Sequence, residues 1–364
     1  MRIIGLFPLT GNGGIATWAK KFVETFPDEE HEFTFVNVSP PTQRNGGFSE
    51  SFPVRAVTGV LELFRIQREL RKLFRKGTFD VLHITTSGSL GTLRDLRVAK
   101  LCKKYGVKTI MHCHYGCITE AINSKGYWGW LLRRAMNEYD LIWVLDKASF
   151  DTLKNIDNLK EKVSMVPNSI DVPETMNPAP VAFDKVAFIG NLYPEKGVFE
   201  LLDACIRRDL RLDIVGPGTD DVLARIKKLV GSRLNEKVFI HGMVPNAEAL
   251  KIMNEVDILA LPTYYPMEAF PISIIEAMSL TKMVISCSRA AIEDILTGLD
   301  DKPCGLLVEP RSADAIVDAI DWCRTHKEEA AQMCRNAYEK VKACYRKELV
   351  YDFYRENYHK LVRE

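Results

Sequence analysis

Residues 258–278 read ILALPTYYPMEAFPISIIEAM, an apolar stretch that contains two acidic residues, Glu268 and Glu276. Its first part predicts a buried strand, Ile258–Pro262, and its last part predicts a helix that begins at Pro271, where proline is favoured. An ionised carboxylate is costly to bury without a partner. Each glutamate must therefore meet a cation, a backbone donor or the hydroxyl groups of a ligand.

The spacing of the two glutamates has two interpretations. The helix would rise roughly 7 to 8 Å from Pro271 to Glu276, so a phosphate held at its N-terminus would leave one carboxylate near each end of a nucleotide-linked sugar. The alternative is that both acids serve local backbone groups or a nearby arginine.

Strands of the same kind are predicted along the whole chain and alternate with helix-length segments. The other predicted strands are Arg2–Pro8, Glu32–Val38, Val81–Thr86, Lys108–His112, Leu141–Leu145, Val163–Val166, Lys185–Gly190, Leu212–Gly216, Lys237–His241, Met283–Cys287 and Gly305–Val308. Most are continuous apolar runs, which are typical of strands covered on both faces. The alternation predicts an α/β fold with two Rossmann-like, doubly wound parallel-sheet domains facing across a cleft that holds the ligand.

A chain of 364 residues is long enough for two domains. The segment Asp171–Asp184 contains three prolines and is the predicted linker. We therefore expect an N-terminal domain over residues 1–171 and a C-terminal domain over residues 172–347.

Composition predicts a cytoplasmic protein. The nine cysteines are dispersed without paired spacings, the N-terminus has no export signal, and no run of 18 apolar residues occurs. Residues 1–170 carry 24 Lys and Arg against 17 Asp and Glu, a net charge of +7, whereas the remainder carries 25 against 31, or −6. This asymmetry indicates an anionic partner for the first half.

Glycine-rich loops follow several predicted strands. Gly13 and Gly14 precede a helix and can expose its N–H groups to an anion. The loop from Gly190 to Gly197 carries Asn191 and Lys196, and the lysine can neutralise phosphate. A third loop contains Gly216 and Gly218, which can bring bare backbone against a base or ribose. In each case the alternative is a structural turn.

The first loop also fits the dinucleotide pattern GxGxxA, since Gly11, Gly13 and Ala16 occupy its three fixed positions. A nicotinamide-dependent oxidoreductase is therefore an alternative. It is disfavoured because the second strand ends at Val38-Ser39 without an acidic residue to hold a ribose.

Two histidines and two cysteines lie within Met111–Cys117. His112 and His114 occupy alternate strand positions and face one side, whereas Cys113 faces the other, and no second ligand pair has zinc spacing, so we expect no metal. A histidine beside a sugar or a core histidine is favoured instead. Two basic stretches, Leu61–Gly77 and Lys125–Arg134, could lie on an anionic lipid surface or form core-packed helices with a solvated face. Nucleic acid is not an expected partner.

In this order the motifs resemble the GT-B retaining glycosyltransferases of family 4, over nearly the whole chain. Glu268-x7-Glu276 looks like the EX7E motif of that family, and Gly13-Gly14 is similar to its N-terminal glycine loop. The segment Val166–Asp171 resembles the one that closes the first domain. Lys196 matches the donor-phosphate lysine, but Asn191 stands where an arginine is usual, which removes a cation.

The resemblance implies a role for each candidate residue. Glu276 would bind the donor ribose, Glu268 the transferred sugar, and His114 the sugar or a phosphate. The last helix, about residues 348–364, would cross back to the first domain. The groups implied in holding the rest of the donor nucleotide are Gly13, Gly14, Asn191, Lys196, Gly216, Gly218, Phe270, Pro271 and Ile272.

The implied activity is transfer of a sugar from a UDP- or GDP-sugar to a glycan or lipid-linked acceptor, in polysaccharide or glycolipid biosynthesis. It would proceed with retention, without a metal or another cofactor, and in the cytoplasm or peripherally on the cytoplasmic membrane face. An alternative is a catalytically inactive partner subunit with the same fold, which Asn191 favours.

Overall fold

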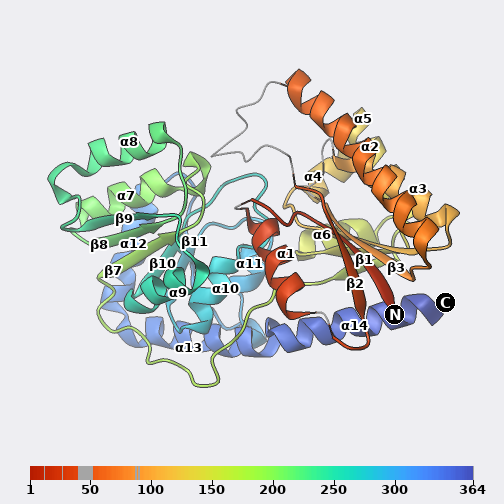
Figure 1. Ribbon diagram of the computed structural model, residues 1–364. Coiled ribbons are helices and arrows are strands. Elements are labelled where there is room, and N and C mark those ends of the chain that lie inside the picture. Colours follow the sequence, from red (N-terminus) through yellow and green to blue (C-terminus); the bar gives the residue numbers. More distant parts are fainter. Residues whose placement is uncertain (12, 27, 40–51, 87, 89–90, 364) are drawn as a thin grey trace. The chain divides into compact units, whose positions relative to one another are not determined.

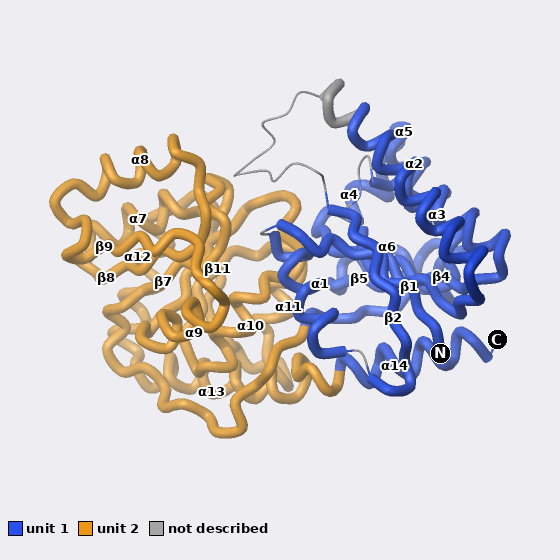
Figure 2. Tube along the Cα trace, viewed as in Figure 1, with its two compact units in different colours: residues 1–44, 48–168, 350–364 blue, residues 45–47, 169–349 orange. Residues whose placement is uncertain are grey.

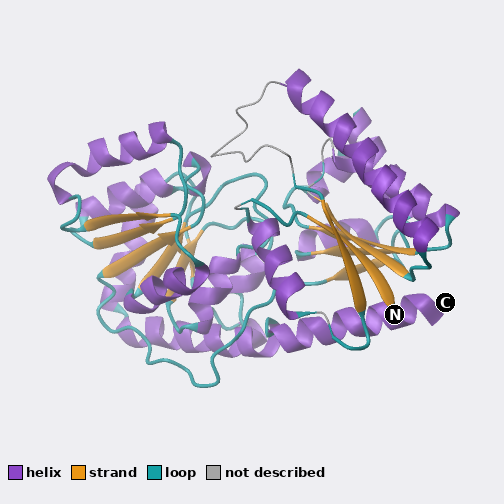
Figure 3. Ribbon diagram, in the orientation of Figure 1, coloured by secondary structure: helices purple, strands orange, loops and turns teal. Residues whose placement is uncertain are grey.

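The computed structural model describes residues 1–11, 13–26, 28–39, 52–86, 88 and 91–363 (Figure 1). The described chain divides into two compact units (Figure 2). Unit 1 holds the residues up to 168 together with those from 350 onward, and unit 2 holds residues 169–349. Each unit is a parallel sheet flanked by helices (Figure 3).

Unit 1 contains a six-stranded sheet with the order β2-β1-β3-β4-β5-β6. All of its neighbouring strands pair in parallel. Its elements are β1 Arg2–Phe7, α1 Gly14–Thr25, β2 Glu32–Asn37, α2 Phe52–Lys76, β3 Val81–Thr86, α3 Gly91–Lys104, β4 Lys108–Cys113, α4 Ile118–Asn123, α5 Tyr127–Glu138, β5 Leu141–Val144, α6 Lys147–Lys154 and β6 Val163–Met165.

Unit 2 contains a second six-stranded parallel sheet with the order β12-β11-β10-β7-β8-β9. Its elements are β7 Lys185–Ile189, the short helix η1 Pro194–Lys196, α7 Val198–Arg207, β8 Arg211–Val215, α8 Asp220–Val230, η2 Gly231–Arg233, β9 Val238–Gly242, α9 Asn246–Glu255, β10 Ile258–Leu261, α10 Ile272–Ser279, β11 Met283–Ser286, α11 Ile292–Leu296, η3 Leu299–Asp301, β12 Leu306–Leu307, α12 Ala313–Thr325 and α13 Lys327–Cys344.

The prediction of two doubly wound parallel sheets is confirmed, and each predicted strand is present within one or two residues of its expected ends. One expected helix start is wrong. Pro271 has an extended ψ of 114° and precedes α10 as its N-cap, so the helix begins at Ile272. Proline still fits there, because its ring fixes only φ, here −69°.

Helix α10 is buried on nearly all sides. It packs against α9, β10, β11 and α13 (Figure 1). Six consecutive residues from Ile274 to Ser279 are buried, including Glu276. The apolar stretch that predicted burial therefore lies in the core of unit 2.

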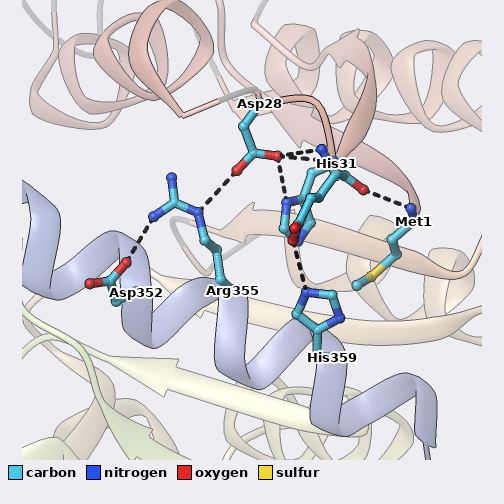
Figure 4. A network of polar contacts seen from close by, with 7 residues as sticks. Met1, Asp28, His31, Asp352, Arg355 and His359 are labelled. Atoms are coloured by element: carbon cyan, nitrogen blue, oxygen red, sulfur yellow. Dashed lines mark hydrogen bonds and ion pairs between the residues drawn. The ribbon is translucent and has the colours of Figure 1, made fainter.

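The final helix, α14 Lys347–Arg363, packs its aromatic side against unit 1 over residues 350–363. Tyr358 is fully buried, and its hydroxyl lies 2.7 Å from Nδ1 of His83 on β3. The exposed side carries an ionic network: Arg355 donates to Asp28 at 3.0 Å and to Asp352 at 2.9 Å (Figure 4). Burial of aromatic rings, reinforced by these ion pairs, holds the end of the chain on unit 1.

Helix α2 contains residues 61–76 of the basic stretch Leu61–Gly77. Leu63, Ile66 and Leu70 are buried as an apolar stripe requires, but the side chain of Phe64 is 58% exposed. Successive helical positions are about 100° apart, so Phe64 lies outside the buried stripe.

Candidate functional site

The candidate residues of unit 2 gather where its strand order reverses. Strands β7 and β10 are neighbours in the sheet, although strands β8 and β9 come between them in sequence. Loops that follow adjacent strands on either side of such a reversal leave in different directions, which opens a binding site at the carboxyl ends of the strands. The loop after β7 carries Lys196, and the loop after β10 carries Glu268.

Lys196 and Glu268 form an ion pair at this position. Nζ of Lys196 lies 2.9 Å from Oε2 of Glu268, and the two side chains are 13% and 10% exposed. The hydroxyl of Thr263, itself fully buried, donates to the same oxygen at 3.3 Å. Of the kinds of partner that the sequence left open for Glu268, the structure supplies a cation, the lysine of the loop that follows β7.

Gly197 sets the position of Lys196. Its φ is +77°, and a Cβ there would lie 2.3 Å from the carbonyl oxygen of Pro262. Only glycine fits both the left-handed backbone and this contact. The close approach brings the end of η1 against the loop that follows β10, next to Glu268.

Glu276 is 8% exposed and is held by an amide. Nδ2 of Asn246, the first residue of α9, donates to its Oε1 at 2.9 Å. The two candidate glutamates thus have different polar neighbours: a lysine beside Glu268 and an asparagine beside Glu276.

Two further candidate glycines of unit 2, Gly216 and Gly218, allow two loops to pack together. Gly216 has φ +133°, and a Cβ there would lie 2.0 Å from the carbonyl oxygen of Gly190. A Cβ on Gly218 would lie 3.0 Å from Leu192. The loop with Asn191 and the loop with Gly216 and Gly218 are therefore neighbours at the ends of β7 and β8, and packing alone already requires small residues there.

Phe270, Pro271 and Ile272 form the entry to α10. The ring of Phe270 packs edge-on against Tyr345, with centroids 5.4 Å apart. The first turn of α10 contains no acidic residue. Its partial positive charge is therefore not neutralised by a carboxylate of that turn, as anion binding at a helix N-terminus requires.

The candidate residues of unit 1 lie at the ends of β1 and β4. Gly13 is the N-cap of α1, and a Cβ on Gly13 or Gly14 would meet no atom within 4 Å. His114 follows β4 and is 7% exposed, and burial lowers the pKa of its imidazole to about 3. The ring is therefore neutral at physiological pH, and its Nε2 has no hydrogen-bond partner among the residues that the structure describes.

Two further features concern metals and membranes. Within the described ranges, His, Cys, Asp and Glu side chains nowhere gather in a group of three or more that could hold a metal ion. A search of the same residues finds no helix with the length and apolar character needed to cross a membrane.

Sequence reasoning missed Asn246 and Thr263. The sequence contained a weak indication of Thr263, because this residue carries a hydroxyl group and lies directly after the predicted strand and before Glu268. Asn246 had none, because an asparagine at the start of a helix usually predicts a cap and its contact with Glu276 spans 30 residues.

Two family models match consecutive parts of the chain. Residues 12–174 match the model described as Glycosyltransferase Family 4, and residues 177–340 match the model described as Glycosyl transferases group 1.

Two sequence relatives and one solved structure illustrate these matches. The putative teichuronic acid biosynthesis glycosyltransferase TuaC of Bacillus subtilis is 28% identical over 159 residues, 43% of this chain and 37% of the relative. The D-rhamnosyltransferase WbpZ of Pseudomonas aeruginosa is 24% identical over 220 residues, 57% of this chain and 56% of the relative. The chain thus spans about half or less of the length of these relatives.

The structure of HepE from Anabaena in complex with UDP superposes with a TM-score of 0.72 and 16% identity, over 99% of this chain and all of that chain. At this level of identity the likeness concerns the fold.

Proposed function

We propose that this chain, a glycosyltransferase of the GT-B fold, transfers a sugar from a nucleotide-sugar donor to a glycan or lipid-linked acceptor. The donor diphosphate lies near Lys196 and the start of α10, the transferred sugar near Glu268, and the ribose near Glu276. On unit 1, considered by itself, we propose Gly13, Gly14 and His114 as residues that contact the substrates.

The observation that carries this proposal is the ion pair of Lys196 and Glu268 beside α10. An ammonium group has three N–H donors, so Lys196 can keep Glu268 and still bind a phosphate oxygen. The N-terminus of α10 adds partial positive charge without an acidic residue in its first turn. Together these groups stabilise the negative charge that develops on the departing diphosphate.

The proposed chemistry follows from this charge distribution. The bond between the anomeric carbon and the diphosphate breaks and its electron pair leaves with the nucleotide. The oxygen of the acceptor hydroxyl forms the new bond, and its proton passes to an oxygen of the departing diphosphate. Attack on the face from which the diphosphate departs gives retention of configuration. Because Lys196 and α10 supply the positive charge, we propose a reaction that needs no metal ion, which is tested by turnover in the presence of a chelator.

Known relatives support the choice of donor and acceptor. Structures with the same fold exist as complexes of HepE with UDP and with UDP-glucose. The two sequence relatives are named for teichuronic acid biosynthesis and for rhamnosyl transfer. We therefore favour a nucleotide-sugar donor and an acceptor used in polysaccharide or glycolipid biosynthesis, at a cytoplasmic location.

Helix α5 supports a peripheral contact with an anionic membrane. Tyr127, Trp128 and Trp130 are 60%, 44% and 50% exposed, and the guanidinium of Arg134 lies 5.7 Å from the ring of Trp130. Exposed aromatic rings next to cationic side chains are typical of surfaces that enter a lipid headgroup region. A lipid-linked acceptor would be reached from such a surface.

The proposal is tested by thermal unfolding in the presence of UDP-, GDP- and ADP-sugars, with NAD as a control ligand. A ligand that binds only the folded state stabilises it by about 2.7 kcal/mol at a hundred times its dissociation constant. We expect stabilisation by at least one nucleotide-sugar and not by NAD. If none of the nucleotide-sugars raises the unfolding temperature, the proposed donor site is wrong.

Asn191 favours a second candidate, a binding subunit without turnover, because an amide replaces a cation near the diphosphate. Measuring donor hydrolysis and sugar transfer by the isolated chain separates the two. Binding without either reaction would support the subunit, and either reaction would exclude it.

A further inference from the structure

Asn246 is placed unusually for a residue at a helix start. It is the first residue of α9, it follows the N-cap Pro245, and the N-cap makes no side-chain hydrogen bond. Asparagine near a helix start is favoured as the N-cap, but in α9 that position belongs to Pro245. Here its amide reaches instead to α10, which lies beside α9 (Figure 1), and donates to Oε1 of Glu276 at 2.9 Å.

The chemistry of the contact fixes the orientation of the amide group. An ionised carboxylate only accepts hydrogen bonds, so the NH2 group of Asn246 must face Glu276. The carbonyl oxygen Oδ1 then points away from that carboxylate as an acceptor. Oδ1 is buried, and no donor for it exists among the residues that the structure describes.

A buried acceptor without a donor is uncommon in folded proteins, and each one needs an explanation, such as a functional role or a bound group that donates to it. A purely structural link between α9 and α10 needs only the NH2 group of Asn246. It gives no reason for an acceptor to remain buried without a donor beside Glu276. A ligand hydroxyl group is a donor that would satisfy it.

We propose that Asn246 is a donor-binding residue that, together with Glu276, recognises the vicinal hydroxyl groups of the nucleotide ribose. Oδ1 of Asn246 accepts a hydrogen bond from one hydroxyl, while the carboxylate of Glu276 accepts from the other. Nδ2 of Asn246 simultaneously holds that carboxylate in place. Two neighbouring acceptors match the two O–H donors of a vicinal diol, and a carboxylate has lone pairs enough to serve both the amide and a hydroxyl.

This inference rests on the proposed function, because it takes the ligand near Glu276 to be a nucleotide. It goes further in two respects: it adds Asn246 to the site, and it predicts that the site distinguishes ribose from deoxyribose. A site built to bind a hydroxyl group rejects the analogue that lacks it, because the protein group is then left unpaired.

The test measures the dissociation constants of UDP, GDP and ADP and of their 2′-deoxy and 3′-deoxy analogues by calorimetry. The proteins are the wild type, Asn246→Ala and the isosteric Asn246→Asp. Asn254→Ala is the matched control, since Asn254 lies near the exposed end of the same helix and bonds with Asn177. Thermal unfolding of each variant reports any loss of folding separately.

We expect the wild type to bind the ribonucleotide about ten-fold more tightly than at least one deoxy analogue. Asn246→Ala should weaken ribonucleotide binding about ten-fold and remove most of that discrimination. Asn246→Asp should bind more weakly still, because it places a second carboxylate beside Glu276. Asn254→Ala should resemble the wild type.

Three outcomes are decisive. Equal ribose discrimination in the wild type and both Asn246 variants would overturn the inference and leave the proposed function intact. Failure of the wild type to bind any of the three nucleotides would overturn the inference and the proposed function together. Selective loss of discrimination in the Asn246 variants, with unchanged unfolding temperatures, would support the inference.

Discussion

Lys196 combines two roles that a single ammonium group can perform together. It neutralises Glu268 at 2.9 Å in a place where both side chains are largely buried. An ammonium group carries three N–H donors, which is enough to bind a phosphate oxygen as well. Removing one partner of a buried pair leaves the other charge uncompensated. The residue should therefore affect both stability and turnover.

We predict that Lys196→Ala lowers the rate of sugar transfer at least ten-fold, which corresponds to about 1.4 kcal/mol of activation free energy. The physical reason is the loss of positive charge beside the leaving diphosphate. The measurement is kcat at saturating donor, for protein shown to be folded by circular dichroism.

Lys302→Ala is the control for that variant. Lys302 also belongs to unit 2, but its side chain is 63% exposed, and its Nζ lies 3.8 Å from Oδ2 of the exposed Asp300. The rate of sugar transfer by Lys302→Ala should equal that of the wild type. A folded Lys196→Ala protein with wild-type kcat would remove Lys196 from the mechanism.

The local sequence predicted that Glu268 and Glu276 need polar partners, but it did not predict which residues those partners are. Two acids in an apolar stretch indicated partners for Glu268 and Glu276, because burial of a charge is costly wherever the chain folds. The identity of the partners depended on strand order. Lys196 reaches Glu268 because β7 and β10 are adjacent, and Asn246 reaches Glu276 because α9 packs on α10.

Helix α5 combines buried residues with exposed aromatic residues. Gly129, Leu131 and Leu132 are buried, whereas the aromatic residues Trp128 and Trp130 are exposed. A Cβ on Gly129 would lie 2.4 Å from the carbonyl oxygen of Ser124, so this helix packs closely and leaves its indoles outside. Sequence periodicity alone could not show that these aromatic residues are exposed, because an aromatic residue is compatible with burial and with exposure.

We predict that the protein binds vesicles containing phosphatidylglycerol and that raised salt releases it, since screening weakens the attraction of basic side chains to anionic lipid. The double variant Trp128→Ala, Trp130→Ala should bind at least ten-fold more weakly, about 1.4 kcal/mol, because two indole groups no longer enter the headgroup region. The measurement is co-sedimentation.

The control for the lipid experiment is Leu229→Ala, which removes a 51% exposed apolar side chain from α8 of unit 2. It should bind vesicles as the wild type does. Equal binding to anionic and to phosphatidylcholine vesicles, or no binding to either, would contradict the lipid proposal.

At the scale of the whole molecule, three buried histidines link stability to pH. Burial lowers the pKa of His83, His112 and His114, and for His83 and His112 the neighbouring imidazoles lower it further. The folded state therefore stays unprotonated at these sites below pH 6.5, the ordinary value, whereas the unfolded state binds protons there. Their contribution to stability is present above pH 6.5 and is lost as the pH falls.

We predict that the free energy of unfolding decreases below pH 6.5 with a slope that approaches about 4 kcal/mol per pH unit when all three groups titrate in the unfolded state. His114→Gln removes one of the protons taken up and should reduce the slope by about 1.4 kcal/mol per pH unit. The measurement is urea unfolding from pH 7.5 to pH 4.5.

Comparing the wild type with His114→Gln isolates the contribution of this imidazole to the pH dependence of the free energy of unfolding. Asp95, whose pKa is raised by its burial, titrates in both and cancels from the difference. Identical slopes for the wild type and His114→Gln would mean that this imidazole does not remain neutral in the folded state.

The sequence by itself determined the two parallel sheets and the segments that form them, because the apolar pattern of a few neighbouring residues predicts a buried strand or an amphipathic helix. It also singled out Glu268, Glu276 and Lys196 as residues that need an explanation. The tertiary structure alone decided which side chains meet. Lys196 meets Glu268 because of the strand order and the left-handed turn at Gly197, and Asn246 meets Glu276 because two helices pack together. No local sequence pattern relates the members of either pair.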